Sequence, residues 1–68
     1  MIVVAAHLDY ATSDIRNAVV AASASIQMAT RTDEAGCHAY CFAADPSINT
    51  RIQVYELWED QEIGRAHV

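Results

Sequence analysis

Apolar and polar positions alternate along the chain from Ile2 to Tyr10. Because successive side chains of a strand point to opposite faces, a period of two predicts a β-strand. The even-numbered residues are expected on one face and the odd-numbered ones, including His7 and Asp9, on the other. Residues Arg51 to Trp58 alternate in the same way and are predicted to form another strand. Its faces carry Ile52, Val54, Glu56 and Trp58 on one side and Gln53, Tyr55 and Leu57 on the other.

The spacing of apolar residues changes to steps of four and three between Asp14 and about Thr30. Such spacing predicts an α-helix with one apolar stripe, and its many alanines leave it thin enough to lie close to a sheet. The stripe consists of Ile15, Val19, Ala22, Ile26 and Ala29, and the residues largely outside it include Arg16, Asn17, Ser23 and Gln27. Thr12 to Asp14 supply oxygens for the first helical turn, and Gly36 allows the chain to turn with a positive φ.

The strand that follows this helix is predicted from Cys37 to about Ala44, and Asp45 to Asn49 is a turn by composition. The turn joins this strand to the next one as an antiparallel hairpin. Glu59 to Val68 is predicted to begin a second helix. The order strand, helix, strand, strand, helix predicts an α+β domain of the ferredoxin-like kind whose final strand is missing. Either the chain is truncated or a partner contributes the closing strand, and the sequence is compatible with both.

The chain has 68 residues, which predicts a single domain over residues 1–68, and 53% of them are hydrophobic. A domain this short buries only roughly 60% of the surface that its unfolded chain exposes. Its core alone seldom supplies more than about 3–5 kcal/mol, and partner subunits are one way to add stability. The surplus of apolar side chains therefore predicts an oligomer, with a homodimer as the simplest form.

Acidic residues outnumber basic ones by 9 to 4, the basic residues are all arginines, and the formal net charge is -5. Nucleic-acid binding requires clustered Lys and Arg, and these arginines do not cluster. No apolar segment approaches the roughly 20 residues of a membrane span. The apolar start of the chain also lacks the basic leader of a secretory signal. We therefore expect a cytoplasmic protein that binds neither nucleic acid nor a membrane.

The two cysteines, Cys37 and Cys41, lie four positions apart in a predicted strand. Residues at that spacing share a face about 13 Å apart, which is too far for a disulfide. A zinc site would need closer ligand spacing and further Cys or His ligands at defined offsets. We therefore expect two free thiols and no metal site.

Two segments carry a distinctive combination of residues. Thr30 to Phe42 contains a helix end, an acidic pair, Gly-Cys and aromatic residues at alternate strand positions, and Tyr55 to Asp60 reads Tyr-Glu-Leu-Trp-Glu-Asp. Together with Ala66 to Val68 they resemble the antibiotic biosynthesis monooxygenase domain family over almost the whole chain. The resemblance implies ferredoxin-like subunits that pair sheet to sheet into a dimeric α/β barrel. Family members continue past the position of His67 to a final strand, so we expect the chain to be C-terminally truncated relative to the family.

The resemblance also implies a function: oxygenation of a small electron-rich aromatic substrate such as a phenol, quinol or anthrone, with no cofactor. Such a substrate can itself give an electron to oxygen once it has lost a proton. The protein then needs a dry pocket, a proton acceptor and donors for the developing oxyanion. Two alternatives remain: a non-catalytic binding or stress-response module of the same fold, and a heme-binding or heme-degrading member.

Three residues are candidates for catalysis: Trp58, His7 and His67. The family keeps a tryptophan at the position of Trp58, whose indole N–H can donate to a bound oxygen. A histidine titrates near neutral pH, so His7 is a candidate proton acceptor, and we expect Trp58 and His7 to converge on one cavity between sheet and helices. His67 resembles a family histidine. The alternatives are a core tryptophan, a structural His7 and a solvated His67 near the chain end.

Three aromatic residues are candidates for lining a substrate pocket. They are Tyr40, Phe42 and Tyr55. A tyrosine hydroxyl can orient a polycyclic substrate, although aromatic residues at alternate strand positions are also typical of an ordinary core. His38 is expected to serve only in packing or at the surface.

Overall fold

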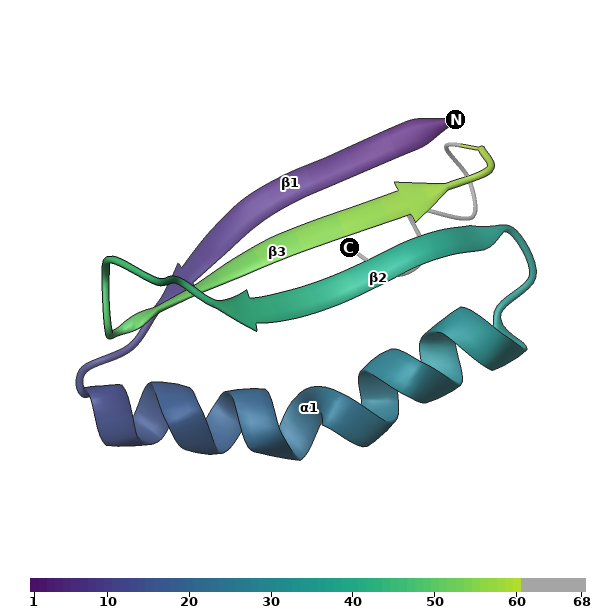
Figure 1. Cartoon of the computed structure of the whole chain (residues 1–68). Helices are drawn as coiled ribbons and strands as arrows, with labels where there is room; N and C mark the ends of the chain where they lie inside the picture. The colour runs from purple at the N-terminus through teal and green to yellow at the C-terminus, as the bar shows by residue number, and fades with distance from the viewer. Residues whose placement is uncertain (61–68) are drawn as a thin grey trace.

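The computed structural model describes residues 1–60 and contains three strands and one helix in that part of the chain. In chain order these are β1 (Ile2–Asp9), α1 (Ser13–Asp33), β2 (Cys37–Ala44) and β3 (Arg51–Trp58) (Figure 1). The predicted α+β class is confirmed, and the arrangement of the elements in residues 1–60 is consistent with a ferredoxin-like fold. The predicted helix over Glu59–Val68 lies almost entirely outside the described residues.

The three strands form one antiparallel sheet in the order β1-β3-β2, so β3 is the central strand. Residues directly opposite each other in an antiparallel pair point to the same face. The register therefore defines two faces, which we name after residues of β3. The Trp58 face carries Ile2, Val4, Ala6 and Leu8 of β1, Ile52, Val54, Glu56 and Trp58 of β3, and Cys37, Tyr40, Phe42 and Ala44 of β2. The Tyr55 face carries the intervening residues.

The apolar core of the described residues lies on the Trp58 face of the central strand. Ile52 and Trp58 are fully buried and Val54 is 7% exposed. The alternation read from Arg51 to Trp58 is thereby confirmed as a difference in burial, because the residues between them are half-buried or exposed. β3 is the most buried strand since it is flanked on both sides.

A register shift between Cys37 and Ala39 interrupts the pairing of β2 with β3. Beyond such an irregularity, the alternation of side chains between the two faces of the sheet is shifted by one residue. Cys37 pairs with Trp58 and Cys41 pairs with Tyr55, so the two thiols lie on opposite faces. The expectation that they share a face is wrong for this reason. The expectation that both are free is confirmed.

The ends of α1 are set by local signals that the sequence shows. Thr12 is the N-cap, and its side-chain oxygen accepts from the backbone N–H of Ile15 at 3.2 Å. At the other end the N–H of Glu34 donates to the carbonyl of Thr30 at 3.2 Å. Gly36 then turns the chain into β2 with a φ of 83°, a conformation that glycine adopts without strain.

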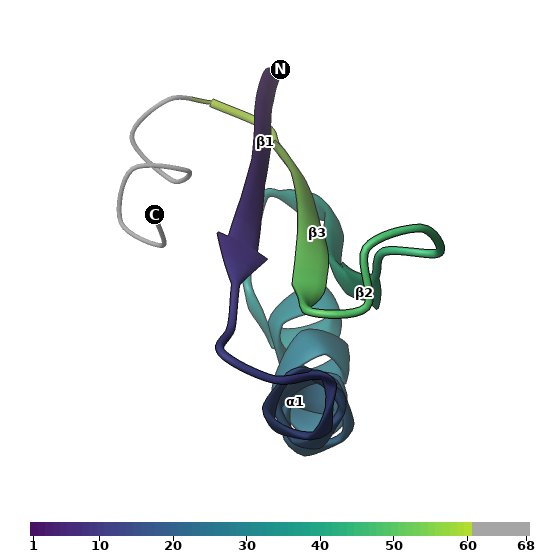
Figure 2. The same ribbon diagram turned by 90° about the vertical axis from the view of Figure 1, so that its left-hand side faces the viewer.

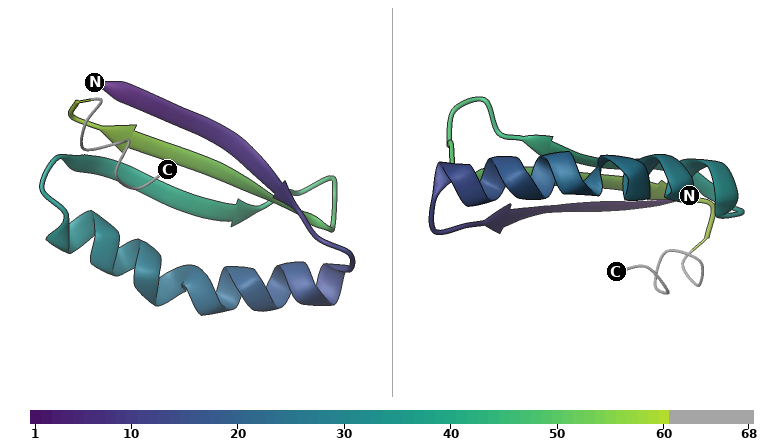
Figure 3. Two further views of the ribbon diagram at one scale, coloured as in Figure 1. Left: turned by 180° about the vertical axis from the view of Figure 1, so that it is seen from behind. Right: turned by 90° about the horizontal axis from the view of Figure 1, so that it is seen from below.

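Helix α1 lies along the free edge of β2 (Figures 1 and 2). The Gln27 side chain bonds both backbone groups of Phe42: its Nε2 donates to the carbonyl at 3.2 Å, and its Oε1 accepts from the N–H at 3.0 Å. Arg31 Nε donates to the carbonyl of Tyr40 at 2.7 Å. These side chains occupy backbone groups that an edge strand otherwise leaves open. Views from behind and below show α1 following the β2 side of the sheet (Figure 3).

The polar side of α1 therefore faces the sheet, and the predicted placement of Arg16 and Gln27 outside the packed stripe is wrong. Arg16 is 8% exposed, and its Nη1 donates to the carbonyl of Arg51 at 3.0 Å. By contrast, Ile15 is 47% exposed and Ile26 is 60% exposed. The need of the β2 edge and of the following loop for hydrogen-bond donors outweighs the burial of the apolar stripe.

The loop between β2 and β3 is organised by Asp45, as its composition predicts. Asp45 Oδ1 accepts from the backbone N–H groups of Ser47 and Ile48, each at 2.8 Å. Its Oδ2 accepts from Gln53 Nε2 at 2.8 Å. The bond from Gln53, followed by the two backbone bonds, lowers the pKa of Asp45 to about 2.

Candidate functional site

Trp58 is the centre of a group of polar and aromatic side chains on the Trp58 face. The indole Nε1 donates a hydrogen bond to Glu56 Oε1 at 2.8 Å. The ring of Tyr40 meets Trp58 edge to face, with centroids 6.2 Å apart and an interplanar angle of 79°. Phe42 follows Tyr40 along β2, with their ring centroids 5.1 Å apart. The indole is thus fixed in position and orientation from two strands.

Glu56 places a carboxylate in the middle of this apolar face. It is 4% exposed, and its cross-strand neighbours are Val4 on β1 and Tyr40 on β2. Among the strand residues of the Trp58 face it alone carries a charged side chain. A charged carboxylate is seldom buried without a partner, and such groups often mark functional sites. Sequence reasoning assigned Glu56 to this face but gave it no role, although one acid within an alternating apolar series was a visible signal.

The negative charge of Glu56 affects the pKa values of two neighbouring side chains. Burial, and after it the negative charge of Glu56, raises the pKa of Tyr40 above its ordinary value. Burial likewise raises the pKa of the Cys37 thiol, with Glu56 as the next cause. Both groups are therefore neutral near pH 7 and keep their protons. The site combines one carboxylate acceptor with neutral phenol, thiol and indole groups.

The part of the Trp58 face that belongs to β1 is more open than the part beside α1. Val4 is half-buried, Ala6 is exposed and Leu8 is 40% exposed. These three residues, which we name the β1 ledge, pair with Glu56, Val54 and Ile52 in turn. Residues 1–60 enclose no pocket around it. The ledge is thus a shallow apolar surface with the Glu56 carboxylate at its border.

His7 lies on the Tyr55 face, where it pairs with Gln53. The offset from Gln53 to Trp58 corresponds to roughly 16 Å along the strand. The expected convergence of Trp58 and His7 on one cavity is therefore wrong, because the strand alternation sends their side chains to opposite faces. His7 is instead in a surface group: its Nε2 lies 3.3 Å from Asp9 Oδ2, and Asp9 Oδ1 accepts from Arg51 Nε at 2.7 Å.

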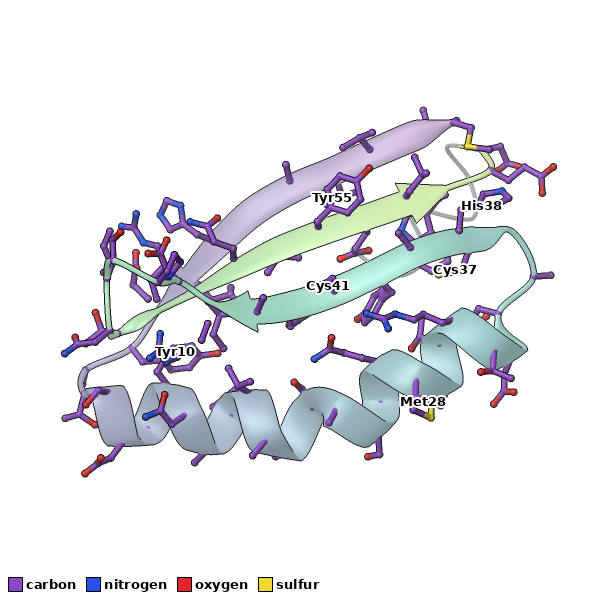
Figure 4. The ribbon with its side chains drawn as sticks, viewed as in Figure 1. Tyr10, Met28, Cys37, His38, Cys41 and Tyr55 are labelled. Atoms are coloured by element: carbon purple, nitrogen blue, oxygen red, sulfur yellow. The ribbon has the colours of Figure 1, made fainter. Side chains whose placement is uncertain are left out.

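The other predicted site residues are also divided by the fold. Tyr40 and Phe42 are on the Trp58 face, whereas Tyr55 is on the opposite face and 46% exposed (Figure 4). The three predicted substrate-binding aromatics therefore do not line one site. His67 lies outside the described residues. His38, for which we expected no role beyond packing or the surface, is exposed.

An uncovered apolar patch occupies the Tyr55 face. Val3 is 56% exposed and Tyr55 is 46% exposed, while Leu57 and Cys41 are half-buried. The His7, Asp9 and Arg51 group borders this patch at one end of the sheet. Large apolar side chains that gather on one face of a sheet are typical of a protein interface.

Residues 1–60 hold no group of three or more His, Cys, Asp or Glu side chains arranged to bind a metal ion. The helix described in that range is not apolar enough to cross a membrane.

Comparison with protein families gives one match, to the family described as antibiotic biosynthesis monooxygenase, over residues 1–68. Comparisons with curated proteins and with solved structures gave no significant match.

Proposed function

The chain belongs to the antibiotic biosynthesis monooxygenase family, and we propose that it oxygenates a small electron-rich aromatic substrate such as a phenol, quinol or anthrone. The observation that carries this proposal is the hydrogen-bonded pair of Trp58 and Glu56, whose carboxylate borders the apolar β1 ledge. The apolar ledge suits an aromatic ring. The indole N–H holds the Glu56 carboxylate in position, and the ring of Tyr40 adds an aromatic edge that can orient the substrate.

Dioxygen is the oxidant in the proposed reaction. The substrate loses a proton from its hydroxyl group, and the resulting phenolate passes an electron to oxygen. Recombination forms a carbon–oxygen bond and a peroxide. Cleavage of the peroxide leaves one oxygen atom as the new carbonyl of a quinone, and the other leaves as water with the two hydrogens that the substrate has lost. The protein contributes position, exclusion of water and a proton acceptor.

We further propose that the working form is a homodimer that buries the Tyr55 face against a second copy. The exposure of Val3 and Tyr55 supports it, because a short domain gains stability when such a patch is covered. Covering that face leaves the Trp58 face available for substrate. The aromatic site and the subunit contact then use opposite sides of the same sheet.

Oxygen uptake with a panel of quinols and anthrones tests the proposed reaction. The wild-type chain should consume oxygen faster than buffer, and Trp58→Phe should lose at least about tenfold in rate, because the Glu56 carboxylate then loses the donor that fixes its position and a small misplacement of such a group costs a factor of that size or larger. Tyr55→Phe is the matched control, because it changes an aromatic residue of the opposite face. Oxygen uptake no faster than the autoxidation of the substrate would contradict the proposed enzymatic activity and favour a binding module of the same fold.

A further inference from the structure

We propose that Glu56 is the acceptor for an aromatic hydroxyl group bound on the β1 ledge, so that the site selects phenolic ligands over their ethers. A role of Glu56 in turnover rests on the proposed function. The preference for phenolic ligands over ethers concerns binding alone and can be measured without turnover. Glu56 Oε2 is the assigned atom, because Oε1 already accepts from Trp58.

The buried carboxylate of Glu56 has few hydrogen-bond partners within residues 1–60. Glu56 is 4% exposed, and within residues 1–60 its one side-chain hydrogen bond is that from Trp58 to Oε1. The ion pairs found in that range involve Asp9 and no group near Glu56. A carboxylate accepts several hydrogen bonds, and a buried one without a cation is unfavourable unless donors surround it. No buried side-chain oxygen or nitrogen in residues 1–60 lacks a hydrogen-bond partner, so Oε2, which accepts no such bond there, keeps some contact with solvent and can accept from a ligand.

Glu56 lies next to the open part of the β1 ledge. Val4 pairs directly with Glu56, and Ala6 is the next residue of β1 on the same face. Neighbouring Cβ atoms across an antiparallel pair lie about 4.5–5.5 Å apart, so a ring resting on these two small side chains is beside the carboxylate. Ala6 leaves room for such a ring because its side chain is one methyl group and is exposed.

The negative charge of Glu56 favours a ligand that brings a hydroxyl group to it. A hydroxyl group donates a hydrogen bond to Oε2, whereas the corresponding methyl ether has no proton to donate. A hydrogen bond to an ionised acceptor is roughly twice as strong as one between neutral groups. Burial and the charge of Glu56 raise the pKa values of Tyr40 and Cys37, so these neighbours are neutral and the ligand meets one anionic group.

Binding measured by calorimetry without oxygen tests the inference, with naphthol and its methyl ether as probes. The full wild-type chain should bind naphthol about ten- to hundredfold more tightly than the ether, the range expected for a hydrogen bond to a charged group. In Glu56→Gln this preference should fall to about threefold or less, since the amide oxygen is neutral but still accepts from Trp58. Glu59→Gln, the same change at an exposed position, should keep the wild-type preference.

Equal affinity of the wild-type chain for naphthol and the ether would overturn the inference, and so would an unchanged preference in Glu56→Gln. If that variant does not fold, as judged by circular dichroism, the wild-type comparison decides alone. A hydroxyl preference without oxygen uptake from any substrate would contradict the proposed function and leave the inference standing. Oxygen uptake without a preference for the hydroxyl group would contradict the inference and leave the proposed function standing.

Discussion

Replacing Gln27 by leucine removes the side-chain amide that joins α1 to the edge of β2. The amide makes two hydrogen bonds with the backbone of Phe42, at 3.0 and 3.2 Å. It also donates to Ser23 Oγ at 2.9 Å within the helix. Leucine has a similar volume and a good helix propensity, so the change isolates the hydrogen bonds from the packing.

The expected loss follows from the two backbone groups that lose their partners. Each hydrogen bond contributes about 0.5–1.5 kcal/mol, and a part-buried N–H or carbonyl without a partner costs about 1–3 kcal/mol. Because Phe42 is half-buried, we take the lower part of this range and expect a loss of about 2 kcal/mol. In a domain this small the midpoint of thermal unfolding should fall by roughly 10 °C.

Urea unfolding followed by far-ultraviolet circular dichroism measures this loss. Met28→Leu is the control, because Met28 neighbours Gln27 in sequence and is 70% exposed, so its change should stay within about 0.5 kcal/mol. A Gln27→Leu variant as stable as the wild type, or more stable, would show that the hydrogen bonds of Gln27 do not stabilise the fold. It would mean that the apolar stripe of α1 packs against the sheet and that Gln27 faces solvent.

Three further predictions follow from other contacts. Ile26→Gln should change the free energy of unfolding by less than about 0.5 kcal/mol, since Ile26 is 60% exposed; a large loss in urea unfolding would contradict this. Because folding lowers the pKa of Asp45 from 3.8 to about 2, its contribution to stability is complete above the unfolded pKa and is lost as the pH falls through the folded one. Asp45→Asn should therefore lower the urea midpoint near neutral pH and narrow its difference from wild type in strong acid. In a Cys41→Ser background, Glu56→Gln should speed alkylation of Cys37 at mildly alkaline pH, because loss of the negative charge lowers the pKa of that thiol; an unchanged rate would mean that the carboxylate does not act on Cys37.

The strands, the helix ends and the hairpin loop were predictable because each depends on neighbours in the sequence. Alternation defines β1 and β3, Thr12 caps α1, and Gly36 reverses the chain. The face of α1 that packs was not predictable from periodicity. It depends on the unpaired backbone of an edge strand, and the sequence does not show which strand is at the edge. Once β2 is known to be that strand, the role of Gln27 follows.

The candidate site was partly predictable for a similar reason. Trp58 was found through the resemblance of its segment to the family, and Tyr40 and Phe42 lie beside it on the same face. His7 was chosen for its chemistry, and only the pairing of β1 with β3 shows that it points to the other face. Glu56 was missed, although its position within an apolar series of strand residues pointed to it. For this residue the position was a better guide than the residue type.

Binding of an aromatic ligand to the Trp58 face can be followed through Trp58 itself. The chain has one tryptophan, so one indole N–H resonance is expected in a nitrogen–proton correlation spectrum. Titration with naphthol in the absence of oxygen should shift this resonance to a saturating value, because the ligand bonds to the carboxylate that holds the indole. An indole resonance that stays in place while naphthol shifts resonances of the Tyr55 face would contradict the account.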